Sequence, residues 1–188
     1  MKATFRWLGA IVGLIVFVVV VGIAVGISVP IYHVASCSAQ VPQAAHDLFT
    51  AVDEDAASTS WRSDLTSVRA SVGDRGERVW VETYGSRQTM SYAEYERIPD
   101  RKVAREIDDP ALPFGGHWEY FFKPDAAGTQ VTITESGWIY NPVVRLVEQY
   151  FTGYTRTIDT YLGDLGRKYG QTPAIACTTA TYSGGLPK

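Results

Sequence analysis

The chain opens with a long run of apolar residues. No charged residue lies between Trp7 and Val29. At about 1.5 Å per residue, a helix of this length measures roughly 34 Å, which is enough to cross a hydrocarbon core of about 30 Å. A cleavable signal peptide has a shorter apolar core of about 7–15 residues, and a buried soluble helix is rarely apolar on every face. We therefore predict an uncleaved transmembrane anchor over residues 1–29, with residues 7–29 in the membrane and a signal peptide as the alternative.

The basic residues around this run predict its orientation. Lys2 and Arg6 precede it, and the next Lys or Arg is Arg62. Positive charge stays on the cytoplasmic side of membranes. We therefore expect a single-pass plasma-membrane protein with a cytoplasmic N-terminus and residues 30–188 on the extracytoplasmic side.

Beyond the anchor, the pattern changes to short alternating segments. Residues 31–41 alternate in the manner of a strand, and residues 42–61 have apolar positions at helical spacing, which predicts one or two short helices ending near Trp61. Six further segments rich in β-forming residues follow, separated by Gly, Pro and Asp where the backbone can reverse. This order predicts an antiparallel sheet of about seven strands.

The last periodic segment predicts one long amphipathic helix that begins at Asn141 and ends near Gly170. Asn141 is a good N-cap, and Pro142 suits the first helical position. The expected apolar stripe is rich in tyrosine and needs a broad apolar partner, for which the inner face of the sheet is the candidate. The stripe comprises Val143, Val147, Tyr150, Phe151, Tyr154, Ile158, Tyr161, Leu162 and Leu165.

Charge excludes two kinds of partner. The exported part carries 15 basic and 20 acidic residues, since Lys2 and Arg6 are the only two of the 17 basic residues before it. Its formal net charge is therefore −5. This charge argues against binding of nucleic acid and against binding of anionic lipid by a cluster of basic residues.

Three stretches carry a family resemblance over about residues 31–170: "WRSDLTSV", "LPFGGHWEYFFKPDAAGTQVTITESG" and "YNPVVRLVEQYFTGYTRTIDTYLGDLGRKYG". Together with the element order, they resemble the START-like (SRPBCC) superfamily, in particular its polyketide cyclase/dehydrase and lipid-transport branch. The resemblance implies an α+β helix-grip domain over residues 30–172, with a curved antiparallel sheet around the long C-terminal helix. The anchor departs from this family, and residues 173–188 lie outside the pattern. We expect that tail to be flexible unless Cys177 tethers it.

The segment "FGGHWEYFFKP" illustrates how the cavity residues are assigned. Trp118, Tyr120 and Phe122 share one face of a strand, so we expect them to form a cavity wall, with His117 and Glu119 turned to water. Applied along the chain, this alternation and the helical stripe give a set of candidate ligand-cavity residues. The set comprises Trp80, Tyr84, Trp118, Tyr120, Phe122, Val131, Ile133, Tyr150, Tyr154, Ile158 and Tyr161.

Two carboxylates are candidates for chemistry inside such a cavity. Glu82 lies between Trp80 and Tyr84 on one strand face, and Glu135 shares a face with apolar residues. Either could act as a general acid or base, or hold a polar group of a ligand. The alternative for either residue is a buried carboxylate paired with an arginine such as Arg105, or simple exposure at a strand end.

No motif indicates a cofactor or a metal. The sequence has no GxGxxG, P-loop, GxSxG, HExxH or CxxC motif, so we expect no cofactor, and His117 with Glu119 alone would be too few ligands for zinc. In "WRSDL", Trp61 is expected in the core, and Arg62 with Asp64 as an ion pair at the surface.

The two cysteines, Cys37 and Cys177, form a possible disulfide if they lie on the oxidising side of the membrane. Sequence alone leaves their proximity open. "VASC", which ends at Cys37, also resembles a lipoprotein cleavage box, but Pro30, Tyr32 and His33 separate it from the apolar run.

These observations predict a membrane-anchored protein that binds a lipid or other hydrophobic small molecule between sheet and helix, and they favour binding over catalysis without deciding between them. One alternative is a polyketide cyclase/dehydrase-like enzyme that uses an acidic or tyrosine residue of the cavity. Another is a protein-interaction domain with a filled core.

Overall fold

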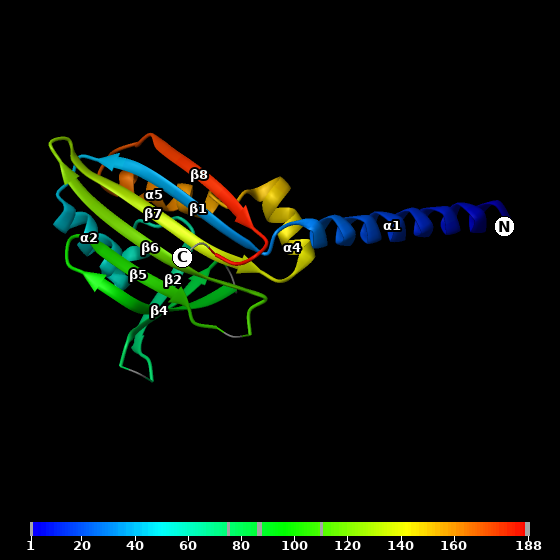
Figure 1. Cartoon of the computed structure of the whole chain (residues 1–188), viewed down its shortest axis with the longest axis horizontal. Helices are drawn as coiled ribbons and strands as arrows, with labels where there is room; N and C mark the ends of the chain where they lie inside the picture. The colour runs from blue at the N-terminus through cyan, green and yellow to red at the C-terminus, as the bar shows by residue number, and fades with distance from the viewer. Residues whose placement is uncertain (1, 75, 86–87, 110, 187–188) are drawn as a thin grey trace.

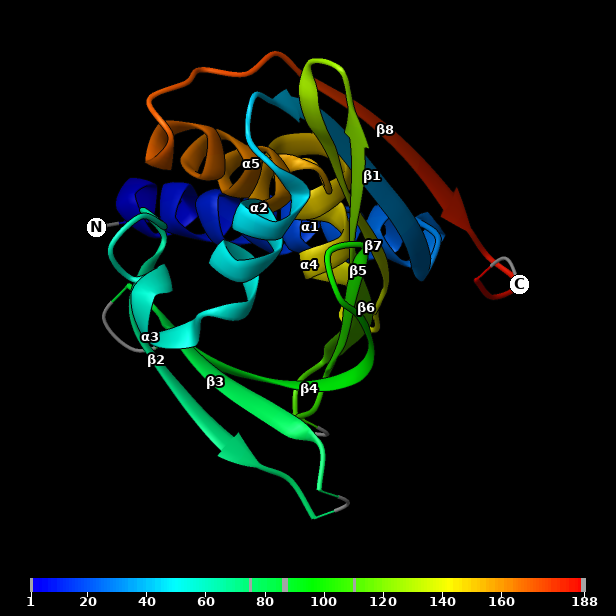
Figure 2. The ribbon, with the colours of Figure 1, turned by 90° about the vertical axis from the view of Figure 1, so that its left-hand side faces the viewer.

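An antiparallel sheet of eight strands curves around helix α5 in the computed structural model, which describes residues 2–74, 76–85, 88–109 and 111–186 (Figures 1 and 2). The strand order is β2-β3-β4-β5-β6-β7-β1-β8. The α+β helix-grip class predicted from the sequence is confirmed. The strands are β1 (Tyr32–Val41), β2 (Leu65–Val72), β3 (Arg78–Tyr84), β4 (Gln88–Ile98), β5 (Lys102–Ile107), β6 (Phe114–Asp125), β7 (Gly128–Ile139) and β8 (Ile175–Tyr182).

Consecutive hairpins build most of the sheet. β2 to β7 pair in sequence order, and β1 returns beside β7. The side chains of Trp118, Tyr120 and Phe122 on β6 are buried, whereas His117 and Glu119 point to the other face. There Glu119 lies 2.7 Å from Nζ of Lys102. The alternation read from the sequence therefore places this strand correctly.

The N-terminal helix α1 (Lys2–Ser28) projects from the domain (Figure 1). Its segment Gly9–Ser28 is long and apolar enough to cross a membrane, a character that a signal sequence would share. Only residues 29–31 connect α1 to β1. Val29 is buried, and the carbonyl of Ile31 accepts a hydrogen bond from the Ile139 amide. The connection is thus part of the folded domain.

The C-terminal helical segment differs from the single helix predicted. Helix α4 (Pro142–Val147) continues into a π-helical turn, η1 (Glu148–Thr152), and Gly153 then breaks the segment before α5 (Arg156–Lys168). Gly153 has a φ of 77°, a left-handed conformation that favours glycine. The N-cap is as predicted, because the side chain of Asn141 accepts from the amides of Val143 and Val144. Of this segment, α5 supplies the fully buried core residues Ile158, Leu162 and Leu165.

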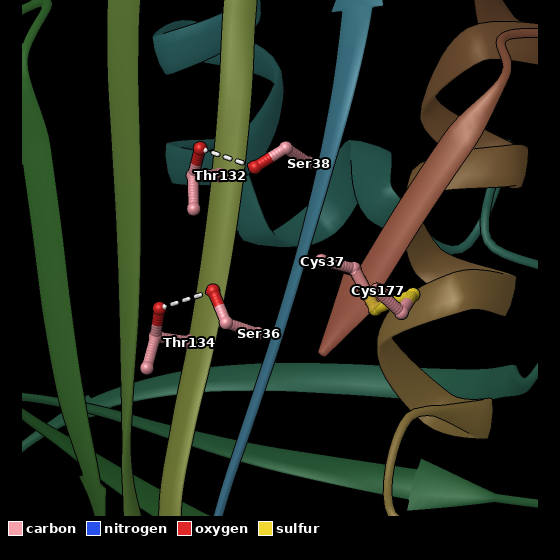
Figure 3. Close-up of a disulfide and its surroundings, with 6 residues drawn as sticks. All are labelled: Ser36, Cys37, Ser38, Thr132, Thr134 and Cys177. Carbon is pink, nitrogen blue, oxygen red and sulfur yellow. Dashed lines mark hydrogen bonds between the residues drawn. A yellow bond between two sulfur atoms is a disulfide. The ribbon is translucent and has the colours of Figure 1, made fainter. Parts of the chain in front are cut away.

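The segment expected to be a flexible tail forms an ordered strand. β8 pairs with β1, and Cys37 lies directly opposite Cys177 in the register. The two residues are joined by a disulfide (Figure 3). On the other side of β1, Ser36 and Ser38 hydrogen-bond to Thr134 and Thr132 of β7 (Figure 3). The possible tether through Cys177 is therefore present, and the sheet gains one strand over the predicted seven.

Two short helices, α2 (Ala45–Asp53) and α3 (Asp55–Ser58), follow β1. Leu48, Phe49 and Val52 of α2 are buried in the core. The last residue of α2, Asp53, accepts hydrogen bonds from Arg78 of β3 at 2.6 Å and from Nη2 of Arg97 of β4 at 2.6 Å. These contacts hold the end of α2 on the sheet.

Candidate ligand cavity

A cavity of about 390 Å³ lies between the sheet and the α4–η1–α5 segment. This volume falls within the range of about 300–1,000 Å³ that is usual for small-molecule sites. Its apolar wall includes Met90, Ile107, Phe114, Trp118, Ile139 and Val144. The cavity is thus lined by both the sheet and the C-terminal helical segment.

A smaller polar recess adjoins the cavity. The recess measures about 10 Å³, close to the space needed for one water molecule. It shares Tyr84, Tyr92, Trp118 and Thr157 with the cavity and is otherwise lined by Arg62, Glu82, Arg105, Tyr120 and Tyr161. The recess therefore forms a polar end of the cavity.

Glu82 is the centre of this recess. Nη1 of Arg62 donates to both of its carboxylate oxygens, at 3.1 and 3.0 Å, and the hydroxyl of Tyr84 also donates to it. Nη1 of Arg105 lies 4.0 Å away. Glu82, Arg62 and Arg105 are all buried. The expected ion pair of Glu82 therefore exists, but Arg62 is its nearer partner.

The position of Arg62 corrects the sequence analysis. Arg62 and Asp64 do form the expected ion pair, at 2.9 Å, but Arg62 is only 6% exposed. Its guanidinium also lies 4.8 Å from the ring centre of Tyr161. Burial alone would lower the pKa of Arg62, but the Glu82 carboxylate and the Tyr161 and Tyr84 rings raise it overall. The side chain therefore stays charged.

The tyrosine hydroxyls form an ordered hydrogen-bond chain. Burial, with the Glu82 carboxylate, raises the pKa of Tyr84, and burial and Tyr84 raise that of Tyr92, so both stay protonated. Tyr84 gives its single proton to Glu82. In the Tyr84–Tyr92 pair, at 3.2 Å, Tyr92 must therefore be the donor. The hydroxyl oxygen of Tyr92 then offers acceptor lone pairs to the cavity.

A second polar pair lies on another wall of the cavity. Nε2 of His33 on β1 lies 3.8 Å from Oε1 of Glu135 on β7. The His33 ring stacks on Tyr154 with centroids 4.3 Å apart. Gly137 leaves room for this ring, because a Cβ at that position would lie 2.6 Å from it. His33, Glu135 and Tyr154 all line the cavity.

The residues predicted for the cavity fall into three groups. Tyr84, Trp118, Tyr120, Tyr154 and Tyr161 line the cavity or the recess. Trp80, Phe122, Val131, Ile133 and Ile158 are buried in the core, with Trp80 between the guanidinium groups of Arg78 and Arg105. Tyr150 is a correction, because it is 63% exposed on η1 and lines neither pocket.

Several residues of the site were not predicted from the sequence, among them Arg62, His33 and Tyr92. Arg62 and His33 each sit in a segment whose pattern is compatible with exposure. The signal for Tyr92 was available, since "TMSYAEY" alternates and Tyr92 falls on the face of Met90. Assigning this face of the strand to the inside of the sheet would have identified Tyr92 as a cavity residue.

Comparison with known proteins adds evidence on the fold. No family model and no curated protein matches the chain. Among solved structures, the di-domain ARO/CYC StfQ of the steffimycin biosynthetic pathway aligns with a TM-score of 0.59 and 14% identity, covering 74% of this chain and 50% of StfQ. The chain has the helix-grip fold of that protein. The di-domain ARO/CYC BexL of the BE-7585A pathway gives a TM-score of 0.58 and 17% identity, with 73% and 50% covered.

A smaller protein shares the same fold over nearly its whole length. A Thermobifida fusca protein aligns with a TM-score of 0.56 and 16% identity, covering 73% of this chain and 93% of its own. The chain spans half the length of the two di-domain proteins. This helix-grip domain therefore corresponds to a single unit of the fold.

Proposed function

We propose that this protein is a membrane-anchored member of the START-like superfamily that binds a lipid or other hydrophobic small molecule. The observation that carries the proposal is the cavity of about 390 Å³, with an apolar wall and one polar end. Burial of apolar ligand surface contributes about 25 cal/mol per Å² before the costs of binding. A filled core would leave no such space, which favours binding over the protein-interaction alternative.

The polar end favours a particular ligand chemistry. Arg62 and Tyr84 donate to Glu82, and Tyr92 donates to Tyr84, so the Tyr92 oxygen that faces the cavity is an acceptor. A ligand hydroxyl or N–H group would satisfy it. We therefore propose an apolar ligand with one such donor at its end.

Two observations support the proposed location. Lys2 and Arg6 precede the apolar helix α1, and no basic residue follows it until Arg62. The disulfide between Cys37 and Cys177 suits an oxidising compartment outside the cytoplasm.

The proposal is tested by analysing molecules that copurify with the full chain. The chain is expressed with its disulfide, purified in detergent, and extracted for mass spectrometry. The test variant is Thr157→Trp, because Thr157 is exposed on α5 and lines both cavity and recess. The control is Asp159→Trp, an exposed position on the same helix that lines neither.

We expect a hydrophobic species near one per protein in the unaltered chain and the control. Blocking the cavity should reduce the amount bound per protein about tenfold. Equal amounts in both variants would place the molecule elsewhere and contradict the proposal.

The His33–Glu135 pair favours one alternative function, a cyclase- or dehydrase-like enzyme. Both oxygens of Glu82 accept hydrogen bonds, whereas Glu135 faces the cavity beside an imidazole. Glu135 is therefore the better candidate for a general acid or base. Loss of turnover in Glu135→Gln, with turnover retained in Glu54→Gln as a control that makes the same charge change at an exposed position, would favour the enzyme.

A further inference from the structure

The segment Tyr140–Gly153 has three faces with different surroundings. Its first face packs on α1. A Cβ on Gly26 of α1 would lie 2.1 Å from the carbonyl oxygen of Pro142, and one on Gly22 would lie 3.8 Å from Leu146. Two glycines four residues apart let helices approach closely. α4 therefore lies directly against the last turns of α1 (Figures 1 and 2).

Its second face lines the cavity. Val144, Glu148 and Gly153 all contribute to the cavity wall, and Tyr154 follows directly. The same short segment thus connects the cavity with the helix that is proposed to cross the membrane.

Its third face is exposed and mainly apolar, with Asn141 and Gln149 as uncharged polar members. Phe151 is 80% exposed and Tyr150 63%, and Tyr140, Val143 and Val147 are also exposed. The only charged residues between positions 140 and 154 are Arg145 and Glu148. Arg145 is buried, and Glu148 lines the cavity and accepts a hydrogen bond from Thr152. The exposed face therefore carries no charge.

The depth of this face follows from the geometry of α1. Gly22 lies six residues before the end of α1 at Ser28. At about 1.5 Å per residue, α4 contacts α1 about 9 Å below that end. Helices that lie in the interface of a bilayer are buried by about 5–10 Å, and tyrosine is enriched at that level. In a chain whose α1 spans the bilayer, the exposed face of Tyr140–Gly153 falls within the outer leaflet.

We propose that the segment Tyr140–Gly153 is seated in the outer leaflet of the membrane that holds α1, so that the cavity meets the lipid directly. The inference rests on the proposed anchorage of α1. It makes the bilayer itself the source of the ligand, since the cavity wall and the lipid-facing surface belong to one segment. The π-helical turn η1 and Gly153 lie where that wall would have to move.

The test uses the full chain reconstituted in phosphatidylcholine nanodiscs. Three variants each carry one added cysteine, labelled with the fluorophore NBD under non-reducing conditions that keep the disulfide intact. Phe151→Cys reports the proposed surface, and Val72→Cys is the control at an exposed apolar residue of β2. Val19→Cys reports whether α1 lies in the bilayer.

We expect lipids brominated near the headgroup to reduce the fluorescence at position 151 about twofold, with little effect at position 72. Aqueous iodide should quench in the opposite order. If the label at position 19 is in lipid and that at position 151 is in water, the seating is wrong and the anchor stands. A label at position 151 that neither quencher reaches would mean that a protein covers the face, which also overturns the proposal. If the label at position 19 is in water, both the anchorage of α1 and the seating of Tyr140–Gly153 are wrong.

Discussion

Single residues at the polar end of the cavity combine two roles, since they hold a buried charge in place and present a defined hydrogen-bonding group to the ligand. The charges of Arg62 and Glu82 neutralise each other. The hydroxyls of Tyr84 and Tyr92 extend a chain of hydrogen bonds from Glu82 to the cavity. Buried ion pairs of this kind are expensive to break from one side, because the remaining charge is left without a partner. The two roles can be separated by substitution.

Arg62→Met should lower the free energy of unfolding by about 3 kcal/mol, because it leaves the Glu82 carboxylate buried with Arg105 only at a distance. Unfolding of the full chain in micelles by urea, followed by tryptophan fluorescence, measures the change. The control is Arg69→Met, at an exposed position of β2. The double variant Arg62→Met/Glu82→Gln should recover part of the loss, and no recovery would show that the ion pair is not its cause.

Tyr92→Phe should leave the fold intact and weaken binding of a ligand with a terminal hydroxyl about tenfold, since one hydrogen bond contributes about 0.5–1.5 kcal/mol. Affinity for the copurified species, measured by displacement of a fluorescent fatty alcohol, reports the change. Tyr95→Phe, on the outer side of β4, is the control. A ligand that binds both variants equally would not use the Tyr92 oxygen.

At the scale of elements, the sequence predicts the strands well and the C-terminal helical segment only in part. Tight turns and alternation are local signals, so the hairpins from β2 to β7 could be derived from them. The break at Gly153 could not, because the apolar stripe continues through Tyr150, Phe151 and Tyr154 at helical spacing. The first half of that stripe, on α4 and η1, is largely exposed, whereas the second half, on α5, is buried against the sheet. Helical periodicity alone does not distinguish an exposed apolar stripe from a buried one. β8 was missed although Ile175, three threonines and Tyr182 favour a strand, because the segment lies outside the family pattern and its partner β1 is distant in the sequence.

The Asp53 carboxylate joins the end of α2 to two strands of the sheet. Burial alone would raise the pKa of Asp53, but the hydrogen bonds from Arg97 and Arg78 lower it overall. A lowered folded-state pKa gives stability that is present above the ordinary pKa of about 3.9 and is lost as the pH falls through the folded value.

Asp53→Asn should therefore lower the free energy of unfolding by about 1 kcal/mol at pH 7, a modest value because both arginines are partly exposed to solvent. The difference from the unaltered chain should shrink as the pH falls below about 4. Thermal unfolding at several pH values measures it, with exposed Asp74→Asn as the control. A difference that persists unchanged at pH 3 would exclude the ion pairs as its source.

For the whole molecule, the disulfide closes the domain between its first and last strands, which are 140 residues apart in sequence. Cross-linking a loop of this length stabilises the folded state by about 4–5 kcal/mol if the effect is entropic. The pairing was left open by the sequence, because the proximity of Cys37 and Cys177 depends on β8 lying beside β1.

The double variant Cys37→Ala/Cys177→Ala should lose about 4 kcal/mol of unfolding free energy, and β8 should exchange its amide hydrogens faster than β7. Hydrogen exchange followed by mass spectrometry reports both strands. Equal protection of β8 with and without the disulfide would show that strand pairing alone retains it.

The connection between α1 and β1 has a consequence for the range over which the protein can act. Residues 29–31 are the whole of it, and they are held in the fold by a buried side chain and a backbone hydrogen bond. If α1 crosses the membrane as we propose, a connection of three residues would keep the domain at the membrane surface, out of reach of a second membrane. Any molecule bound in the cavity would then have to be delivered and removed at that surface, so the protein would act where it is anchored and would not carry a ligand between membranes.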